Sequence, residues 1–276
     1  MICGAPFLGA LLTIPDLTLG SISRAAYVIA GILALAIHVY LYNAWAGLVY
    51  DQADPRRRVD PLLRGQLKPV KALAASLVSL GISLAMFLSL SIILFLIALA
   101  EAGLWFLYAH PRIGLKRIPV VPTLLHVVGG TLAVYLACAA MEGLSLKNIW
   151  VSFYFGLVLG AGHLNHELMD CEADRLGNFK TSPIRFGKKP VFIASFIVFT
   201  FSTAYFCGLT AAGVLPGSIA WGLVAVYPLY CMSVFRAYGA GFSAAALRRL
   251  RSQYRALYVA AGVYMTLILL LGKIDE

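Results

Sequence analysis

Charged residues are scarce in this chain. Asp, Glu, Lys and Arg make up only 12% of its 276 residues, whereas 61% are hydrophobic and the mean hydropathy is +0.86. Soluble domains carry about 25% charged residues, so the composition excludes a soluble globular protein. It predicts an all-α, polytopic membrane protein, because a helix satisfies its backbone polar groups within one segment as it crosses lipid.

Cysteine is also sparse, and its spacing excludes two further classes of protein. The five cysteines are scattered, mostly within apolar segments, and no CxxC pair occurs. The sequence therefore predicts neither a disulfide framework nor a zinc site. A basic leader and a cleavage motif are missing before the first apolar stretch, so we expect that stretch to be a membrane segment and not a signal peptide.

Apolar runs long enough to cross a bilayer recur along the chain. A membrane helix needs about 20 apolar residues, and about nine runs approach that length, near residues 2–19, 25–49, 68–88, 90–109, 119–141, 146–169, 190–212, 214–236 and 254–273. We therefore predict one integral-membrane domain over residues 1–276, a bundle of about nine transmembrane helices around a central cavity. Gly156 and Gly160, one turn apart in the sixth run, predict close packing against a neighbouring helix.

Positive charge is concentrated in four segments between these runs. The net charge of +10 would suit nucleic acid, but Lys and Arg gather after the second, fourth, sixth and eighth runs, and the other loops carry almost none. This alternation is the pattern that orients a membrane protein in the bilayer. The positive charge is therefore explained by orientation, and we expect membrane lipids and no nucleic acid as partners. The alternation places the N-terminus and the four basic loops in the cytoplasm. The fourth of these loops contains Arg248, Arg249, Arg251 and Arg255.

A run of imidazoles and carboxylates ends the sixth apolar segment. It includes His163, His166, Glu167, Asp170 and Asp174, which fall largely on one face at helical spacing. Ionisable residues in a membrane are costly and usually mark a functional site. Two carboxylates one turn apart repel each other unless a cation lies between them, so Asp170 and Asp174 predict a divalent-metal platform at the membrane edge. An iron or zinc site made by His163, Glu167 and Asp170 is the alternative.

Acidic residues lie on the same expected membrane face as the basic loops. Asp51, Asp54 and Asp60 lie in the first basic loop, after the second run, and Glu172 and Asp174 lie in the third, after the sixth run. Carboxylates hold Mg²⁺, Mg²⁺ holds phosphate oxygens, and Lys or Arg neutralises the remaining charge. The apolar tail of such a ligand would lie among the helices, so a lipid diphosphate fits both parts of the pattern.

The motifs at these positions resemble those of UbiA-type intramembrane prenyltransferases. Residues 170–187, DCEADRLGNFKTSPIRFG, resemble the second aspartate motif of the family, a DxxxD pair followed by Arg, Gly and a Thr-x-Pro-like segment. Residues 43–51, NAWAGLVYD, resemble its first motif, in which Gly47 stands where an Asp is expected. Residues 60–65 resemble an Arg-Pro-Leu-x-x-Gly segment, with Asp60 replacing the Arg, and residues 107–117 resemble the loop after the fourth helix.

This resemblance implies a Mg²⁺-dependent transfer of a prenyl group from a prenyl diphosphate to an aromatic acceptor (a quinone precursor or tetrapyrrole) or a lipid acceptor. It implies catalytic roles for Asp51, Asp170 and Asp174, and metal binding by these three residues together with Asn43. The residues expected to bind the diphosphate are Asn43, Arg64, Lys68, Lys116, Arg117, Arg175, Lys180 and Arg185.

The loss of a carboxylate at Gly47 leaves three classes of function open. The first is a prenyltransferase, and the second is a UbiA-type terpene cyclase. The third is a non-catalytic subunit that binds a lipid or quinone among membrane-protein partners in a larger complex. Mg²⁺-dependent release of diphosphate separates the first two from the third, and product analysis separates the first from the second.

Overall fold

The computed structural model describes residues 4–51, 62–177 and 179–274, and every regular element within these ranges is helical. The helices are α1 (Gly4–Thr13), α2 (Leu19–Asp51), α3 (Pro69–Leu90), α4 (Ile92–Ala109), α5 (Val121–Glu142), α6 (Leu146–Leu176), α7 (Ser182–Phe186), α8 (Lys188–Ala211), α9 (Ala220–Gly239) and α10 (Ala244–Ile274). Two short 3₁₀ turns, η2 (Leu115–Arg117) and η3 (Gly217–Ile219), precede α5 and α9. The all-α prediction is confirmed.

The long helices are those of an integral membrane protein. Seven of the described helices, α2 to α5 and α8 to α10, are long and apolar enough to cross a membrane. Helix α6 matches α10 in length at 31 residues, but polar side chains interrupt its apolar sequence. Large apolar side chains such as Val78, Trp221 and Phe235 are more than 60% exposed. Lipid tails cover such side chains as well as a protein core does, because both are apolar.

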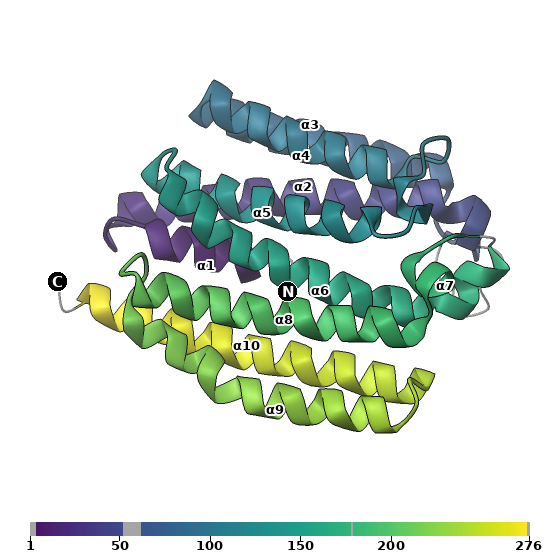
Figure 1. Ribbon diagram of the computed structural model, residues 1–276. Helices are drawn as coiled ribbons and strands as arrows, with labels where there is room; N and C mark the ends of the chain where they lie inside the picture. The colour runs from purple at the N-terminus through teal and green to yellow at the C-terminus, as the bar shows by residue number, and fades with distance from the viewer. Residues whose placement is uncertain (1–3, 52–61, 178, 275–276) are drawn as a thin grey trace.

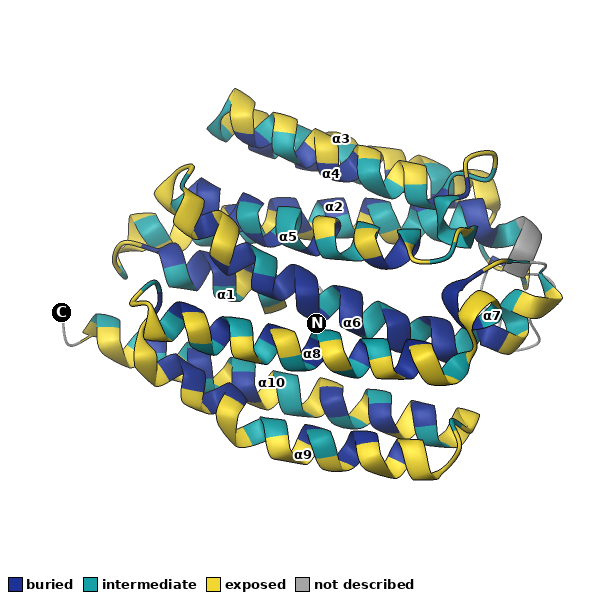
Figure 2. Ribbon diagram, in the orientation of Figure 1, coloured by how far each residue is buried: buried dark blue, intermediate teal, exposed yellow. Residues whose placement is uncertain are grey.

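The long helices alternate in direction, so the connections between them gather at two ends of the bundle (Figure 1). One end, here called the motif end, holds residues 62–68, 110–120, 177, 179–187 and 240–243. The far end holds residues 14–18, Ser91, residues 143–145 and residues 212–219. Helices α5 and α6 pack against each other in the middle, and α6 also contacts α8, α10 and α1. Figure 2 shows that α6 is buried over much of its length.

Glycines bring α5 and α6 into close contact. A Cβ atom added at Gly156 would overlap Thr131 Oγ1 and the backbone oxygen of Val127, and one at Gly160 would overlap the side chain of Val127. The predicted close packing at Gly156 and Gly160 is confirmed. The missing side chains let the α6 backbone approach α5, as small residues do between membrane helices.

The prediction that residues 2–19 form a membrane span is wrong. Helix α1 has only ten residues and ends before Pro15, which disfavours helical geometry in the residue before it. The chain then turns at Asp16, whose carboxylate accepts hydrogen bonds from the Ser21 hydroxyl (2.6 Å) and the Thr18 hydroxyl (2.7 Å). These hydrogen bonds hold the pKa of Asp16 below its ordinary value.

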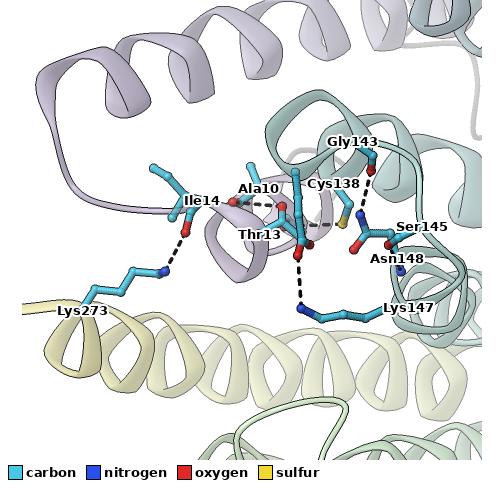
Figure 3. Close-up of polar contacts among 11 residues, drawn as sticks. Ala10, Thr13, Ile14, Cys138, Gly143, Ser145, Lys147, Asn148 and Lys273 are labelled. Atoms are coloured by element: carbon cyan, nitrogen blue, oxygen red, sulfur yellow. Dashed lines mark hydrogen bonds and ion pairs between the residues drawn. The ribbon is translucent and has the colours of Figure 1, made fainter. Parts of the chain in front are cut away.

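Polar contacts fasten α1 to its neighbours at the far end (Figure 3). Lys273 Nζ donates a hydrogen bond from α10 to the carbonyl oxygen of Ile14 (2.6 Å), and Cys138 Sγ on α5 donates to the carbonyl oxygen of Gly9 (3.4 Å). Asn148 at the start of α6 donates to the carbonyl oxygen of Gly143 (3.0 Å). The first helix is thereby held to α5 and α10.

The charge pattern had predicted that the fourth basic segment is a loop, and this prediction is wrong. Arg248, Arg249, Arg251 and Arg255 lie within the first turns of α10, which begins at Ala244. The turn falls earlier, at Gly241 and Phe242, which both adopt positive φ angles of 63° and 59°. The basic residues therefore extend a membrane helix beyond its apolar part.

Candidate functional site

The carboxylate pair lies on the last turns of α6. Ser145 begins this helix by accepting a hydrogen bond from the backbone N–H of Asn148 (3.1 Å), and the helix continues to Leu176. Asp170 and Asp174 are therefore one turn apart and close to one helical face, and both are partly buried. This places two oxygen ligands together at the motif end.

The loop between α4 and α5 contacts the first motif segment, which lies on α2. Gly114 adopts a left-handed backbone conformation (φ 56°), which glycine tolerates without strain, and leads directly into η2. Lys116 in η2 lies so that its Nζ donates a hydrogen bond to Asn43 Oδ1 on α2 (3.4 Å). Two residues expected to bind a diphosphate are thus neighbours, although 73 positions separate them in the chain.

The same loop also contacts the segment after α6. The guanidinium of Arg117 lies over the ring of Phe179, 5.2 Å from its centroid, and Arg117 Nη2 donates a hydrogen bond to the Pro111 carbonyl oxygen (3.4 Å). The backbone N–H of Val120 donates to Ser182 Oγ (3.1 Å) at the start of α7. Three of the expected motif segments, 43–51, 107–117 and 170–187, therefore meet at one end of the bundle.

The remaining basic candidates have different surroundings. Arg64, Lys68, Lys180 and Arg185 are exposed at the motif end. Arg175 Nη1 donates to Glu172 Oε2 (2.9 Å), and Lys188 Nζ donates to Glu172 Oε1 (3.0 Å). Lys188 and then Arg175 hold the pKa of Glu172 below its ordinary value. Glu172 thus lies in an ion-pair network outside the carboxylate pair.

Deeper in the bundle, the structure brings two side chains from other helices against His163 and Glu167, which helical spacing had already placed on one face of α6. This imidazole cluster consists of Tyr108, His126, His163 and Glu167. The rings of His126 on α5 and His163 on α6 are stacked with centroids 3.8 Å apart, and the Tyr108 ring meets both edge-on at 5.3 and 6.5 Å. His163 Nε2 lies 3.6 Å from Glu167 Oε1.

The cluster contains buried polar atoms without hydrogen bonds. Neither Glu167 oxygen nor His163 Nε2 makes a hydrogen bond of acceptable geometry, although Ser182 lies near Glu167. Glu167 is only 5% exposed. A buried polar group without a partner costs about 1–3 kcal/mol, so this arrangement requires an explanation beyond packing.

A family model of the UbiA prenyltransferase family matches residues 5–256. The chain belongs to this family. The apo structure of a UbiA homologue from Aeropyrum pernix K1 has 22% sequence identity and a TM-score of 0.75, over 95% of each chain. A UbiA homologue from Archaeoglobus fulgidus bound to DMAPP and Mg²⁺ has 16% identity and a TM-score of 0.71, over 96% of this chain and 94% of that one.

A further solved structure, of digeranylgeranylglyceryl phosphate synthase, has 14% identity and a TM-score of 0.74, over 100% of this chain and 94% of that chain. No curated protein sequence matches the chain. At these identities the structural likeness establishes the fold. The family match independently supports prenyltransferase-type chemistry.

The described part of this UbiA-family chain supplies some of the ligands that Mg²⁺ requires. Asp170, Asp174 and Asn43 offer carboxylate and amide oxygens, the donors that this hard cation prefers. Asp51 ends α2, but its side chain lies outside the described residues, as do Asp54 and Asp60. Within the described ranges no three His, Cys, Asp or Glu side chains form a group able to hold a metal ion. The alternative iron or zinc site of His163, Glu167 and Asp170 is therefore not formed.

The sequence motifs did not place Arg251 among the site residues. Arg251 on α10 is partly buried, and its Nε is enclosed without a hydrogen-bond partner. It lies close enough to His166 on α6 to interact with it electrostatically. The signal in the sequence was the spacing of Leu247, Leu250 and Tyr254, which marks this segment as an amphipathic helix with one buried face.

Proposed function

We propose that this chain transfers a prenyl group from a prenyl diphosphate to an aromatic or lipid acceptor within the membrane. The observation that carries the proposal is the meeting of the three motif segments at one end, with Asn43 and Lys116 in contact and Asp170 and Asp174 one turn apart. The motif end lies on the cytoplasmic side in this proposal, because the basic loops gather there.

The chain's own residues have distinct roles in the proposed reaction. Lys116, together with Arg117, neutralises diphosphate oxygens, and the exposed Arg64, Lys68, Lys180 and Arg185 attract the anion to the motif end. Asp170 and Asp174, with Asn43 and Asp51, are the residues that would hold Mg²⁺, which stabilises the charge that develops on the leaving diphosphate. The apolar helices surround the prenyl chain and exclude water from the reacting carbon.

Relatives of the same fold support the donor class. A UbiA homologue has been solved with DMAPP and Mg²⁺, and another structure is that of digeranylgeranylglyceryl phosphate synthase. We propose that this chain likewise binds a prenyl diphosphate together with Mg²⁺. A quinone precursor, a tetrapyrrole and a glycerol phosphate lipid are the acceptor classes to test.

Purified protein in nanodiscs with Mg²⁺ tests the proposal. Dimethylallyl, geranyl and geranylgeranyl diphosphate are offered with each acceptor class, and diphosphate release and the product are measured. Asp170→Ala and Asp174→Ala should abolish Mg²⁺-dependent diphosphate binding, whereas Glu172→Gln should leave the Mg²⁺ dependence of that binding unchanged, because Glu172 pairs with Arg175 and Lys188 and not with the metal.

The outcomes distinguish the open classes. Prenylated acceptor supports the proposal. Diphosphate release with a cyclised prenyl product and no prenylated acceptor indicates a terpene cyclase. Absence of diphosphate release from every donor, with lipid or quinone binding retained, indicates a non-catalytic membrane subunit and contradicts the proposal.

A further inference from the structure

The imidazole cluster lies at the depth where a reacting acceptor must be. Glu167 precedes Asp170 by three residues and His163 precedes it by seven, so at about 1.5 Å per residue they lie roughly 5 and 10 Å further into the bundle. The reacting carbon of a prenyl diphosphate is bonded directly to the diphosphate. An acceptor that attacks this carbon therefore lies within one or two turns of the carboxylate pair, beside the cluster.

We propose that His163, supported by Glu167, is the base that takes the proton released by the acceptor. This inference rests on the proposed prenyl transfer. Its basis is the pair itself, in which His163 Nε2 lies 3.6 Å from Glu167 Oε1 and neither atom has a hydrogen-bond partner. A base must offer a free lone pair within reach of the proton that it removes, and the buried carboxylate stabilises the imidazolium that results.

The proton and the electron pairs balance in this step. The bond between prenyl C1 and the diphosphate oxygen breaks, and its electrons leave with the diphosphate. A bond forms between C1 and a carbon or oxygen atom of the acceptor, which loses its hydrogen as a proton. That proton passes to His163 Nε2, while the neutral His163 ring keeps its own hydrogen on Nδ1 before the reaction.

His126 positions this base. A carbonyl oxygen only accepts, so His126 Nδ1 donates to the Pro122 carbonyl oxygen (2.7 Å), which fixes the orientation of the His126 ring. The His163 ring stacks on it at 3.8 Å, and the two planes differ by only 16°. Tyr108 lies edge-on against both rings and within electrostatic range of Glu167, Asp174 and Asp170. The base and the carboxylate pair are thus connected through one shared side chain.

The experiment compares His163→Ala and Glu167→Gln with wild type in nanodiscs. It uses Mg²⁺, geranyl diphosphate, and whichever of a hydroxybenzoate, a dihydroxynaphthoate or a prenylglycerol phosphate the wild type turns over fastest. General-base catalysis contributes about 10²–10⁴-fold, so each variant should lose about 100-fold or more in kcat. The Kd for geranyl diphosphate should stay within about two-fold, and added imidazole should restore turnover to His163→Ala.

His38→Gln is the matched control. This histidine is also buried, at 5% exposure, but it contacts Ser76 on α3, outside the cluster. We expect its turnover to stay within about two-fold of wild type. If His163→Ala fails to fold, the nearly isosteric Glu167→Gln decides the question by the same measurements.

Three outcomes would overturn the inference. The first is a kcat for the cluster variants equal to that of His38→Gln. The second is loss of geranyl diphosphate binding together with turnover and without imidazole rescue, since this indicates a structural role. In both cases prenyl transfer by the wild type stands. A wild type that prenylates no acceptor overturns the proposed function, and this inference with it.

Discussion

Replacing Gly156 by alanine tests whether the close approach of α5 and α6 stabilises the fold. The new Cβ would overlap both Thr131 Oγ1 and the backbone oxygen of Val127. A backbone oxygen cannot rotate away, and atoms in contact pack at about 3.5–4.0 Å between carbons. The two helices must therefore separate by about an ångström at this point.

The expected cost follows from two opposing effects. Overpacking of this kind costs about 1–3 kcal/mol, whereas exchanging glycine for alanine inside a helix gains about 0.5–1 kcal/mol. Because the obstacle is backbone, we expect Gly156→Ala to be destabilised by about 1–2 kcal/mol net. At about 2–4 °C for each kcal/mol, its Tm should fall by several degrees.

Gly81→Ala on α3 is the matched control, since nothing lies within 4 Å of a Cβ added there. Thermal unfolding of wild type and both variants is followed by circular dichroism in one detergent. Gly156→Ala should unfold first, and Gly81→Ala at or above the wild-type temperature. Equal Tm values for the two variants would refute the reasoning that close contact between α5 and α6 stabilises the protein.

Two further predictions concern charge. Gly47→Asp adds a carboxylate one turn before Asp51 on α2, so it should lower the Mg²⁺ concentration needed for half-maximal turnover; a loss of stability without that shift contradicts the reasoning. Lys188 and Arg175 lower the folded-state pKa of Glu172 below its ordinary 4.5. The ion pairs of Glu172 therefore stabilise the protein above pH 4.5, and this stabilisation disappears as the pH falls through the folded-state pKa. The Tm of Glu172→Gln should therefore lie below wild type at neutral pH and approach it in acid, and a difference that does not depend on pH argues against these ion pairs.

The sequence predicted the helices well and their ends less well. Apolar runs determine which segments cross lipid, so α2 to α5 and α8 to α10 were expected near their observed positions. Charge does not report where a helix ends. Between Ala244 and Tyr254 no Pro or Gly interrupts the chain, and the basic residues there continue α10 because nothing in the backbone stops it.

The sequence also predicted part of the candidate site and missed another part. The resemblance of separate motifs brought Asn43 and Lys116 into one expected site, and their contact agrees with that. The stacking of His126 on His163 could not be predicted, because it depends on how α5 and α6 are rotated against each other. Spacing along one helix gives the face on which a residue lies, but not the neighbour that this face meets.

Two of the connections at the far end of the bundle are very short turns. A single residue, Ser91, separates α3 from α4, and its hydroxyl accepts a hydrogen bond from the backbone N–H of Ile93 (3.1 Å). Residues 143–145 alone connect α5 to α6. A protease needs several residues of extended chain to cleave, so these turns offer it almost no substrate. A protease added to an oriented membrane preparation should therefore leave both of these turns uncut.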